Sequence, residues 1–228
     1  MGFRTRVVIP AFDAGEAVAA VVRSVREQGW DDVLVIDDGS RDGTGDFARK
    51  AGARVVTHAV NRGKGTALRT GLSVCRDDGI DAMLTLDADG QHKATDLRVL
   101  MDASEDRDAL VLGIRDLVRA GAPRANQMSN GISDFFLSRF AGMHLRDTQC
   151  GLRRYPVART IALDPRGTGY EFEAEIILRA ARGAVSIVQV PIDVHYPPEK
   201  DRKSHFRTRR DVPRIIFRVL ETLATARR

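Results

Sequence analysis

The chain has 228 residues, of which 43% are hydrophobic and 29% charged, a balance typical of one soluble globular domain with a proper core. No apolar stretch approaches the roughly 20 residues that span a bilayer, and no repeat is present. Two cysteines, Cys75 and Cys150, are too few for a disulfide framework or a zinc site. We therefore expect a cytoplasmic protein whose thiols are buried.

The positive charge of the chain is concentrated near its end. The formal net charge is +5, yet residues 199–228 hold ten lysines and arginines against four acidic residues, so the rest is close to neutral. A nucleic-acid-binding domain would be expected to spread positive charge over its folded surface. The distribution argues against a nucleic-acid partner and favours a local anionic partner, such as a phosphate group or a membrane surface.

Short apolar runs alternate with helical patterns through the first half of the chain. Strands are predicted over residues 6–11, 33–37, 53–57, 82–87 and 109–114, and helices over 16–28, 43–50, 64–76 and 95–103. Because each strand is apolar on both faces, we expect parallel pairing in an α/β, Rossmann-like sheet with helices on both faces. Ligands of such sheets bind beyond the carboxyl ends of the strands.

The regular alternation of predicted strands and helices does not continue in the second half of the chain. Helices are predicted over residues 126–141 and 171–182, and strands over 185–190 and 192–195. Residues 207–226 form an amphipathic and basic helical pattern, in which one stripe holds Val212, Ile215, Ile216, Val219, Leu220 and Leu223, and another holds Arg207, Arg210, Arg214 and Arg218. This helix either packs on the domain with a solvated arginine face or lies on a membrane surface.

Polar clusters follow three of the predicted strands. Asp87 and Asp89 come after the fourth, where alternate carboxylates of an extended chain can share one Mg²⁺ or Mn²⁺ and its diphosphate ligand. The similar pair Asp106 and Asp108 lies in a charged stretch and is interpreted as a solvated loop.

The second strand ends in Asp37 and Asp38, whose carboxylates suit a nucleobase N–H or ribose hydroxyls, while the nearby Asp42 suits a helix cap. After the third strand, the glycines and Lys64 of residues 61–65 precede a helix and suit a diphosphate. The motif is neither a Walker A loop nor a dinucleotide fingerprint.

Taken in order and spacing, seven segments resemble the family 2 glycosyltransferases of the GT-A fold, and most closely the dolichol-phosphate mannosyltransferase-like branch. They are VIPAFD (8–13), DDGS (37–40), NRGKG (61–65), DADGQH (87–92), GIR (113–115), DTQCGLR (147–153) and GYEFE (169–173). The resemblance implies an inverting, metal-dependent transfer of a hexose from a GDP- or UDP-linked sugar to a polyprenyl phosphate. It also implies one catalytic domain over residues 1–205, with a nucleotide-sugar half (1–120) and an acceptor half (121–205), followed by the basic helix (206–228).

The same resemblance assigns roles to residues by position. The donor nucleotide-sugar would contact Pro10, Phe12, Asp13, Asp37, Asp38, Lys64, Asp87 and Ala88. A divalent cation, Mg²⁺ or Mn²⁺, would be held by Asp87, Asp89 and Gln91. The acceptor phosphate would face Arg115, Arg124, Ser129, Lys203 and Arg207, and the residues given catalytic roles are Asp147, Asp89 and Arg115. Where the family has Asn-Glu, this chain has Asp13 and Ala14, which leaves the donor base open.

The remaining alternatives differ in the chemical group of the acceptor that attacks the sugar. A phosphate acceptor is already an anion and needs little general base, whereas a hydroxyl on a lipid, a glycan or a metabolite needs a carboxylate to take its proton. Asp147 is the first candidate for that base, unless it caps a turn or pairs with Arg153. Glu171 and Glu173 are the others, unless they only begin a helix. A sugar nucleotidyltransferase and a non-enzymatic nucleotide-binding module are the less favoured alternatives.

Overall fold

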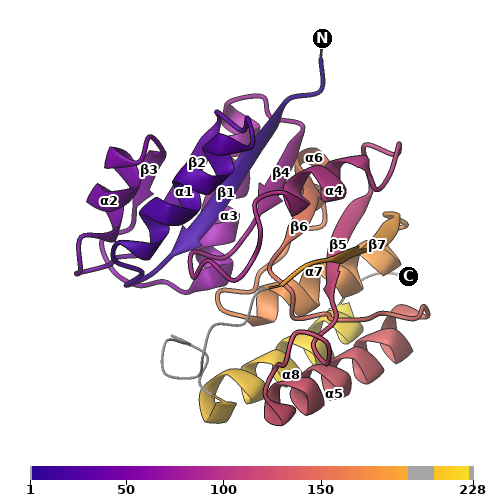
Figure 1. The fold of residues 1–228 in the computed structure, drawn as a ribbon. Helices are drawn as coiled ribbons and strands as arrows, with labels where there is room; N and C mark the ends of the chain where they lie inside the picture. Colours follow the sequence, from indigo (N-terminus) through magenta and orange to yellow (C-terminus); the bar gives the residue numbers. More distant parts are fainter. Residues whose placement is uncertain (1, 195–207, 226–228) are drawn as a thin grey trace.

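The computed structural model describes residues 2–194 and 208–225, without the side chains of residues 208–210 and 212. Within these residues a seven-stranded sheet has the order β3-β2-β1-β4-β6-β5-β7 (Figure 1). The strands are β1 (Thr5–Ala11), β2 (Val33–Asp37), β3 (Arg54–Thr57), β4 (Ala82–Thr85), β5 (Leu110–Arg115), β6 (Arg153–Pro156) and β7 (Ile187–Ile192). The helices are α1 (Ala17–Glu27), α2 (Thr44–Lys50), α3 (Lys64–Asp77), α4 (Asp96–Asp102), α5 (Arg124–Ala141), α6 (Val157–Ala162), α7 (Glu171–Arg182) and α8 (Thr208–Thr225).

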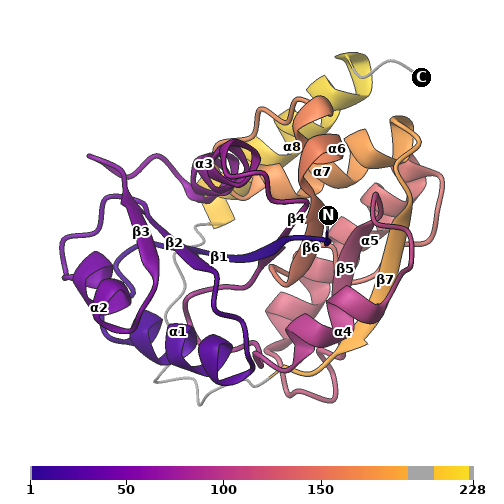
Figure 2. The same ribbon diagram turned by 90° about the horizontal axis from the view of Figure 1, so that it is seen from above.

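Helices cover both faces of the sheet, and each face has its own apolar core (Figure 2). Val7 and Ile9 of β1 point to the core formed with α1, α2 and α4, whereas Val8 points to the core formed with α3, α5 and α7. This alternation follows from the two-residue period of a strand and explains why every residue of β2 is buried. The expected α/β sheet with helices on both faces is confirmed.

The sheet is mostly parallel, as expected, and β6 is the exception. β6 pairs antiparallel with both β4 and β5 and lies between them, while the other pairs are parallel. β6 has no apolar pattern, because it holds Arg153 and Arg154, and both are almost fully buried. Arg153 donates to the carbonyls of Cys150, Thr148 and Glu173, so its guanidinium is satisfied without water.

The end of the described chain also differs in detail from expectation. The two strands predicted over 185–190 and 192–195 are one strand, β7, which runs parallel to β5, and Val194 then forms an isolated bridge with His92. α8 packs against α7 through Val219, with Ile215 and Leu223 partly buried beside it. No helix among the described residues is long and apolar enough to cross a bilayer.

Candidate functional site

The carboxyl ends of β1, β2, β4 and β5 meet at one edge of the sheet. Because β6 is antiparallel, the segment that precedes it reaches the same edge, where the hydroxyl of Thr85 donates to the carbonyl of Gly151 at 2.8 Å. The three polar clusters predicted after strands, and the 147–153 segment, are therefore brought to one place. This edge is the candidate active site.

Asp87 and Lys64 form the centre of this edge. The Lys64 ammonium lies 2.7 Å from Asp87 Oδ1 and 3.0 Å from Glu173 Oε1, and 5.8 Å from the ring centre of Tyr170. Burial would lower the pKa of Lys64, but the two carboxylates raise it well above its ordinary value. Burial would likewise raise the pKa of Asp87, but Lys64 and His92 hold it well below its usual range. Both groups therefore stay charged at neutral pH.

Asp89 lies exposed beside this centre, and its Oδ1 accepts the backbone N–H of Gln91 at 3.0 Å. Desolvation by the surrounding loops and the charge of Asp87 both raise the pKa of Asp89. Two carboxylates that repel one another in this way fit a hard cation such as Mg²⁺ or Mn²⁺. Residues 2–194 and 208–225 hold no group of three or more acidic, His or Cys side chains placed to bind a metal. A cation at Asp87 and Asp89 would thus take other oxygen ligands, as a diphosphate supplies.

The loop before α3 does not form the open anion site that its glycines suggested. The backbone N–H groups of Arg62 and Gly63 donate to the buried carboxylate of Asp38, at 3.0 and 2.7 Å. Asp38 also accepts from His58 Nδ1 at 2.6 Å, and the N–H of Thr66 donates to the carbonyl of Thr168. Asp38 was expected to contact the donor, but its oxygens are occupied by the protein. It is an anchor that fixes the loop carrying Lys64.

Close backbone packing explains the glycines of this loop. A Cβ on Gly63 would lie 2.4 Å from the carbonyl oxygen of Thr168, and one on Gly65 would lie 2.7 Å from that of Gly167. Gly63 also has a φ of 92°, which favours glycine. The glycines therefore let α3 approach residues 167–169. Glu171 and Glu175 in turn hold this segment, by accepting the N–H groups of Thr168 and Gly167.

The remaining residues expected at the nucleoside lie along the ends of β1, β2 and β4. Pro10 and Asp37 pair with neighbouring strand positions, and Asp37 Oδ1 accepts the N–H of Ser40. Asp13 has a φ of 45° and accepts the N–H of Arg41, while Phe12 follows β1 and Ala88 is buried between the two aspartates. As expected, Asp42 accepts the N–H of Thr44 at the start of α2.

Asp147 lies at the same edge but is not placed as a free base. Its carboxylate, 3% exposed, accepts the backbone N–H, Nε and Nη2 of Arg115 at 2.7 to 2.8 Å, and Asn130 Nδ2 at 2.9 Å. The pairing with Arg153 considered above is wrong, because Arg153 bonds backbone carbonyls. Asp147 thus orients Arg115 at the end of β5, in a loop held by Asp134 of α5.

The expected acceptor residues are less closely grouped. Arg124 is exposed at the first turn of α5, and Ser129 is half-buried on the same helix, where its carbonyl accepts Gln149 Nε2. Lys203 and Arg207 lie outside the described residues. Glu171 and Glu173, considered as bases, lie in the first turn of α7. Hydrogen bonds from Gly169 and Thr168 outweigh burial and lower the pKa of Glu171.

Three residues of the site, His58, Asn130 and Gly151, had no role assigned from the sequence, and Glu173 had been considered as a base. Glu173 binds Lys64, His58 binds Asp38, and Asn130 binds Asp147. Gly151 touches Asp87, since a Cβ there would lie 2.5 Å from Asp87 Oδ2. Gly151 lies in the DTQCGLR segment and Glu173 in the GYEFE segment, but these contacts join residues distant in sequence, and no local pattern reveals the contacts themselves.

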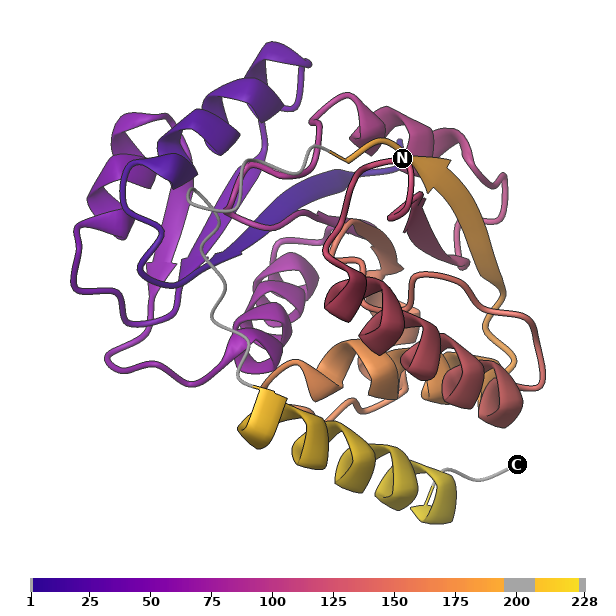
Figure 3. The same ribbon diagram turned by 60° about the horizontal axis from the view of Figure 1, so that its bottom comes forward.

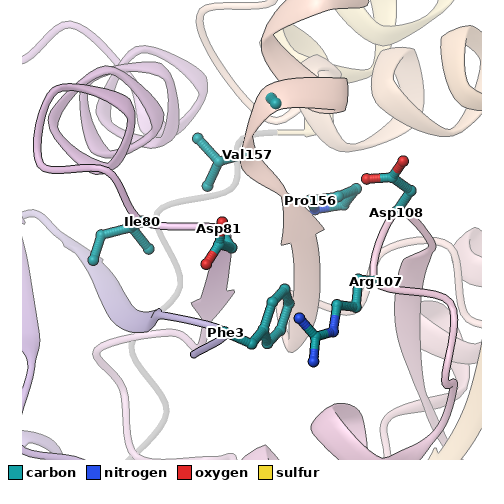
Figure 4. Close-up of a pocket in the computed structure, with 8 residues that line it drawn as sticks. Phe3, Ile80, Asp81, Arg107, Asp108, Pro156 and Val157 are labelled. Atoms are coloured by element: carbon teal, nitrogen blue, oxygen red, sulfur yellow. The ribbon is translucent and has the colours of Figure 1, made fainter. Parts of the chain in front are cut away.

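Two hollows of about 280 Å³ each lie outside this centre. The first is at the opposite edge of the sheet, where Phe3, Asp81, Arg107 and Pro156 surround it near the start of β4 (Figure 4). The second lies between the segment before α7 and α8, and its lining combines cationic and apolar side chains. It is lined by Thr168, Glu171, Pro213, Arg214, Phe217 and Arg218. Thr168 connects it to the start of α3.

A sheet of this order, with a carboxylate pair and a buried lysine at its carboxyl edge, is typical of α/β proteins that bind ligands beyond the carboxyl ends of their strands. The family described as Glycosyl transferase family 2 matches residues 6–158. The chain is 31% identical to the undecaprenyl-phosphate mannosyltransferase of Micrococcus luteus over 201 residues, covering 83% of this chain and 82% of that protein. It is 30% identical to the polyprenol monophosphomannose synthase of Mycolicibacterium smegmatis over 207 residues, covering 83% and 76%. The chain belongs to glycosyl transferase family 2, and it is a glycosyltransferase.

Solved structures confirm the GT-A fold. The glucosyl-3-phosphoglycerate synthase of Mycobacterium tuberculosis in complex with phosphoglyceric acid superposes with a TM-score of 0.77 at 20% identity, over 98% of this chain and 81% of that one. The same synthase in complex with Mn²⁺, UDP-glucose and phosphoglyceric acid gives a TM-score of 0.76 at 19% identity, over 98% and 80%.

Proposed function

We propose that this glycosyltransferase moves a hexose from a nucleotide-sugar to a polyprenyl phosphate, with inversion at the anomeric carbon. A phosphate oxygen of the acceptor would attack that carbon, and the bond to the nucleoside diphosphate would break on the opposite side. The acceptor recorded in the names of the Micrococcus and Mycolicibacterium relatives supports this assignment. A lipid-linked acceptor would place the reaction at a membrane surface, at the cytoplasmic face.

The observation that carries the proposal is the state of Asp147. Its carboxylate is committed to Arg115 and Asn130, so a hydroxyl acceptor would lack the base expected for it. An acceptor phosphate is already ionised and needs no such base. Arg115, held by two side-chain hydrogen bonds to Asp147, would instead bind the acceptor phosphate. The hollow lined by Arg214, Arg218 and Phe217 supports a lipid phosphate as well, since it offers both cationic and apolar contacts.

At the donor, Asp87 and Asp89 would hold a divalent cation together with the diphosphate. When bound, this cation would neutralise charge on the leaving diphosphate. Lys64 keeps Asp87 ionised and in place, and Asp38 fixes the loop from which Lys64 projects. Asp37 and Asp13, at the ends of β2 and β1, would contact the nucleoside.

The first test is donor binding by the purified protein to a panel of UDP, GDP and dTDP sugars, with Mn²⁺, Mg²⁺ or a chelator. We expect selective binding that needs the cation and is lost in Asp89→Ala. The matched control is Asp108→Ala, which removes the last aspartate of the other Asp-x-Asp pair, exposed and paired with Arg159 on the surface. Equal loss in both variants, or binding that ignores the chelator, would contradict the metal-dependent site.

The second test fixes the donor and varies the acceptor among a short-chain prenyl phosphate, the corresponding prenol and phosphoglycerate. The proposal predicts transfer to the prenyl phosphate alone, with product inverted at the anomeric carbon. Transfer to the prenol or to phosphoglycerate would instead favour the hydroxyl-acceptor alternative. In that case Asp147→Asn should abolish turnover while donor binding remains.

A further inference from the structure

α5 exposes a stripe of large apolar side chains, although Leu137 and Phe140 of the same helix pack in the core. Its outward face carries Met128, Ile132, Phe135 and Phe136, which are 68%, 54%, 68% and 50% exposed. These positions recur at spacings of three and four residues, so they form one stripe. A surface helix normally presents polar residues outward and buries such a stripe. Large apolar side chains gathered on one exposed face mark a surface that another protein or a membrane covers.

The inward face of α5 joins the core through Leu137, and its polar side chains belong to the site. Asn130 donates to Asp147, the hydroxyl of Ser133 lies 2.8 Å from that of Thr148, and Asp134 accepts the N–H groups of Asp147 and Thr148. These contacts fix the orientation of the helix, because a rotation that buried the apolar stripe would break all of them. The exposure of the stripe is therefore built into the fold.

Charge around the stripe identifies what covers it. Residues 117–146 contain four arginines, Arg119, Arg124, Arg139 and Arg146, and the single acidic residue Asp134, which faces inward. Arg124 and Arg139 are exposed near the two ends of the stripe, and the exposed Val118 precedes it. Phenylalanine and isoleucine side chains framed by arginines match a bilayer interface, where apolar groups enter the acyl boundary and arginines meet anionic headgroups.

The position of α5 in the molecule agrees with this match. α5 and α8 both pack against α7 and lie at the same end of the protein (Figure 1). In Figure 3, where this end comes forward, no described element lies in front of α5. α8 also exposes Ile216, Phe217 and Leu220. These residues would extend the apolar surface at that end.

We infer that the outward face of α5 docks on an anionic lipid bilayer. The inference rests on the proposed function and deepens it, because the helix that enters the interface is the one that orients Asp147 and, through it, Arg115. It adds a second element to the alternative in which the basic C-terminal helix lies on the membrane surface. A lipid-linked phosphate would thus meet Arg115 from the side of the molecule that faces the bilayer.

The test is flotation with vesicles of phosphatidylcholine and phosphatidylglycerol in equal parts. We expect the wild-type protein to float with them, less at high salt, and to bind pure phosphatidylcholine vesicles weakly. Ile132→Gln with Phe135→Gln should weaken binding about tenfold or more, since two large apolar groups leave the interface. The matched control, Val60→Gln with Val99→Gln, alters exposed apolar residues elsewhere, and binding should be unchanged.

Phe135→Trp provides a second measurement, which detects insertion into the bilayer directly and does not depend on a loss of vesicle binding. The new indole should shift its emission to the blue when vesicles are added, beyond any change shown by Trp30 in the wild type. Thermal unfolding and donor binding of each variant, measured without lipid, separate a folding defect or a failed donor site from a failed membrane surface. Vesicle binding without any sugar transfer would contradict the proposed function and leave this inference standing.

Three outcomes would overturn the inference. One is wild-type protein that does not float with anionic vesicles, and another is equal flotation of the Ile132→Gln, Phe135→Gln variant. The third is a concentration-dependent dimer in sedimentation that the double variant abolishes, because a second copy of this chain would then cover the face.

Discussion

Lys64 lies against two carboxylates with only 17% of its side chain exposed. Replacing Lys64 with glutamine removes the positive charge that pairs with Asp87. We therefore expect Lys64→Gln to lower the free energy of unfolding by about 2 to 4 kcal/mol at neutral pH. The sign with pH follows from the lowered pKa of Asp87. Such a group stabilises the folded state above its unfolded pKa of about 3.9, and the stabilisation is lost as the pH falls toward the folded pKa.

The difference between wild type and Lys64→Gln should therefore be large at neutral pH and shrink at about pH 3, where protonated Asp87 no longer needs a partner in the variant. Urea unfolding at the two pH values measures it. A difference that is the same at both would show that Lys64 stabilises the fold by packing rather than through Asp87.

Gly151 offers a separate test of how the 147–153 segment supports the carboxylates. Gly151→Ala would place a methyl group 2.5 Å from Asp87 Oδ2, so that Asp87 must move. We expect at least a tenfold loss of cation-dependent donor binding, since one misplaced ligand weakens a site by about 10- to 100-fold. Titration with the nucleotide-sugar and Mn²⁺ measures the loss.

Gly131 of α5 is the control, because a Cβ there meets nothing within 4 Å. Gly131→Ala should bind the donor normally and gain up to about 1 kcal/mol of stability from helix propensity. If Gly151→Ala bound the donor as well as Gly131→Ala does, Asp87 would not depend on the neighbouring segment.

At the level of elements, α8 shows how one helix divides its apolar residues between two environments. Val219 is 8% exposed against α7, whereas its neighbour Leu220 is 56% exposed. Val219→Ala should lower the free energy of unfolding by about 1 to 2 kcal/mol, and Leu220→Ala should change it by less than about 0.5 kcal/mol. Chemical denaturation of the two variants compares them. Equal effects would mean that α8 does not pack as described.

The sequence predicted the elements that have a regular apolar pattern. The strands and helices of residues 6–115 were found because their burial repeats at two or near 3.6 residues. β6 was missed, since Arg153 and Arg154 are buried by bonds to carbonyls that come from other segments. The amphipathic stripe of α8 was found, but it grouped the exposed Ile216 and Leu220 with the buried Val219, because a pattern alone does not show how wide the contact with α7 is.

The site residues were predicted from local patterns, which do not show contacts with residues distant in the sequence. The pairing of strand ends brought Asp87 and Lys64 to one edge, as expected. Asp38 was assigned to the donor because a carboxylate after a strand suits a ligand, yet its partners are the N–H groups of a loop after the next strand. Asp147 was likewise treated as a base, since nothing local to it indicates Arg115 and Asn130.

At the level of the whole molecule, the expected halves 1–120 and 121–205 share one sheet. β6, from the second half, lies between β4 and β5 of the first, and among the described strands β5 pairs only with β6 and β7. We therefore expect a single cooperative unfolding transition. Trp30, the only tryptophan, packs against the apolar core on the α1 face of the sheet, beside Arg98. Its fluorescence and the far-UV circular dichroism should give the same urea midpoint, and separated midpoints would show that the halves unfold independently.

The position of β6 also has a consequence for the nascent chain. The ribosome delivers β1 to β5 first, and until residue 156 has emerged β4 keeps one unpaired backbone edge and β5 keeps both. Such apolar edges are prone to pair with other chains, so this interval is when aggregation threatens and when chaperones would act. The two arginines of β6 then close the gap from both sides. A strand that carries so little apolar signal is thus the one that joins β5 to β4, before β7 pairs with the other edge of β5.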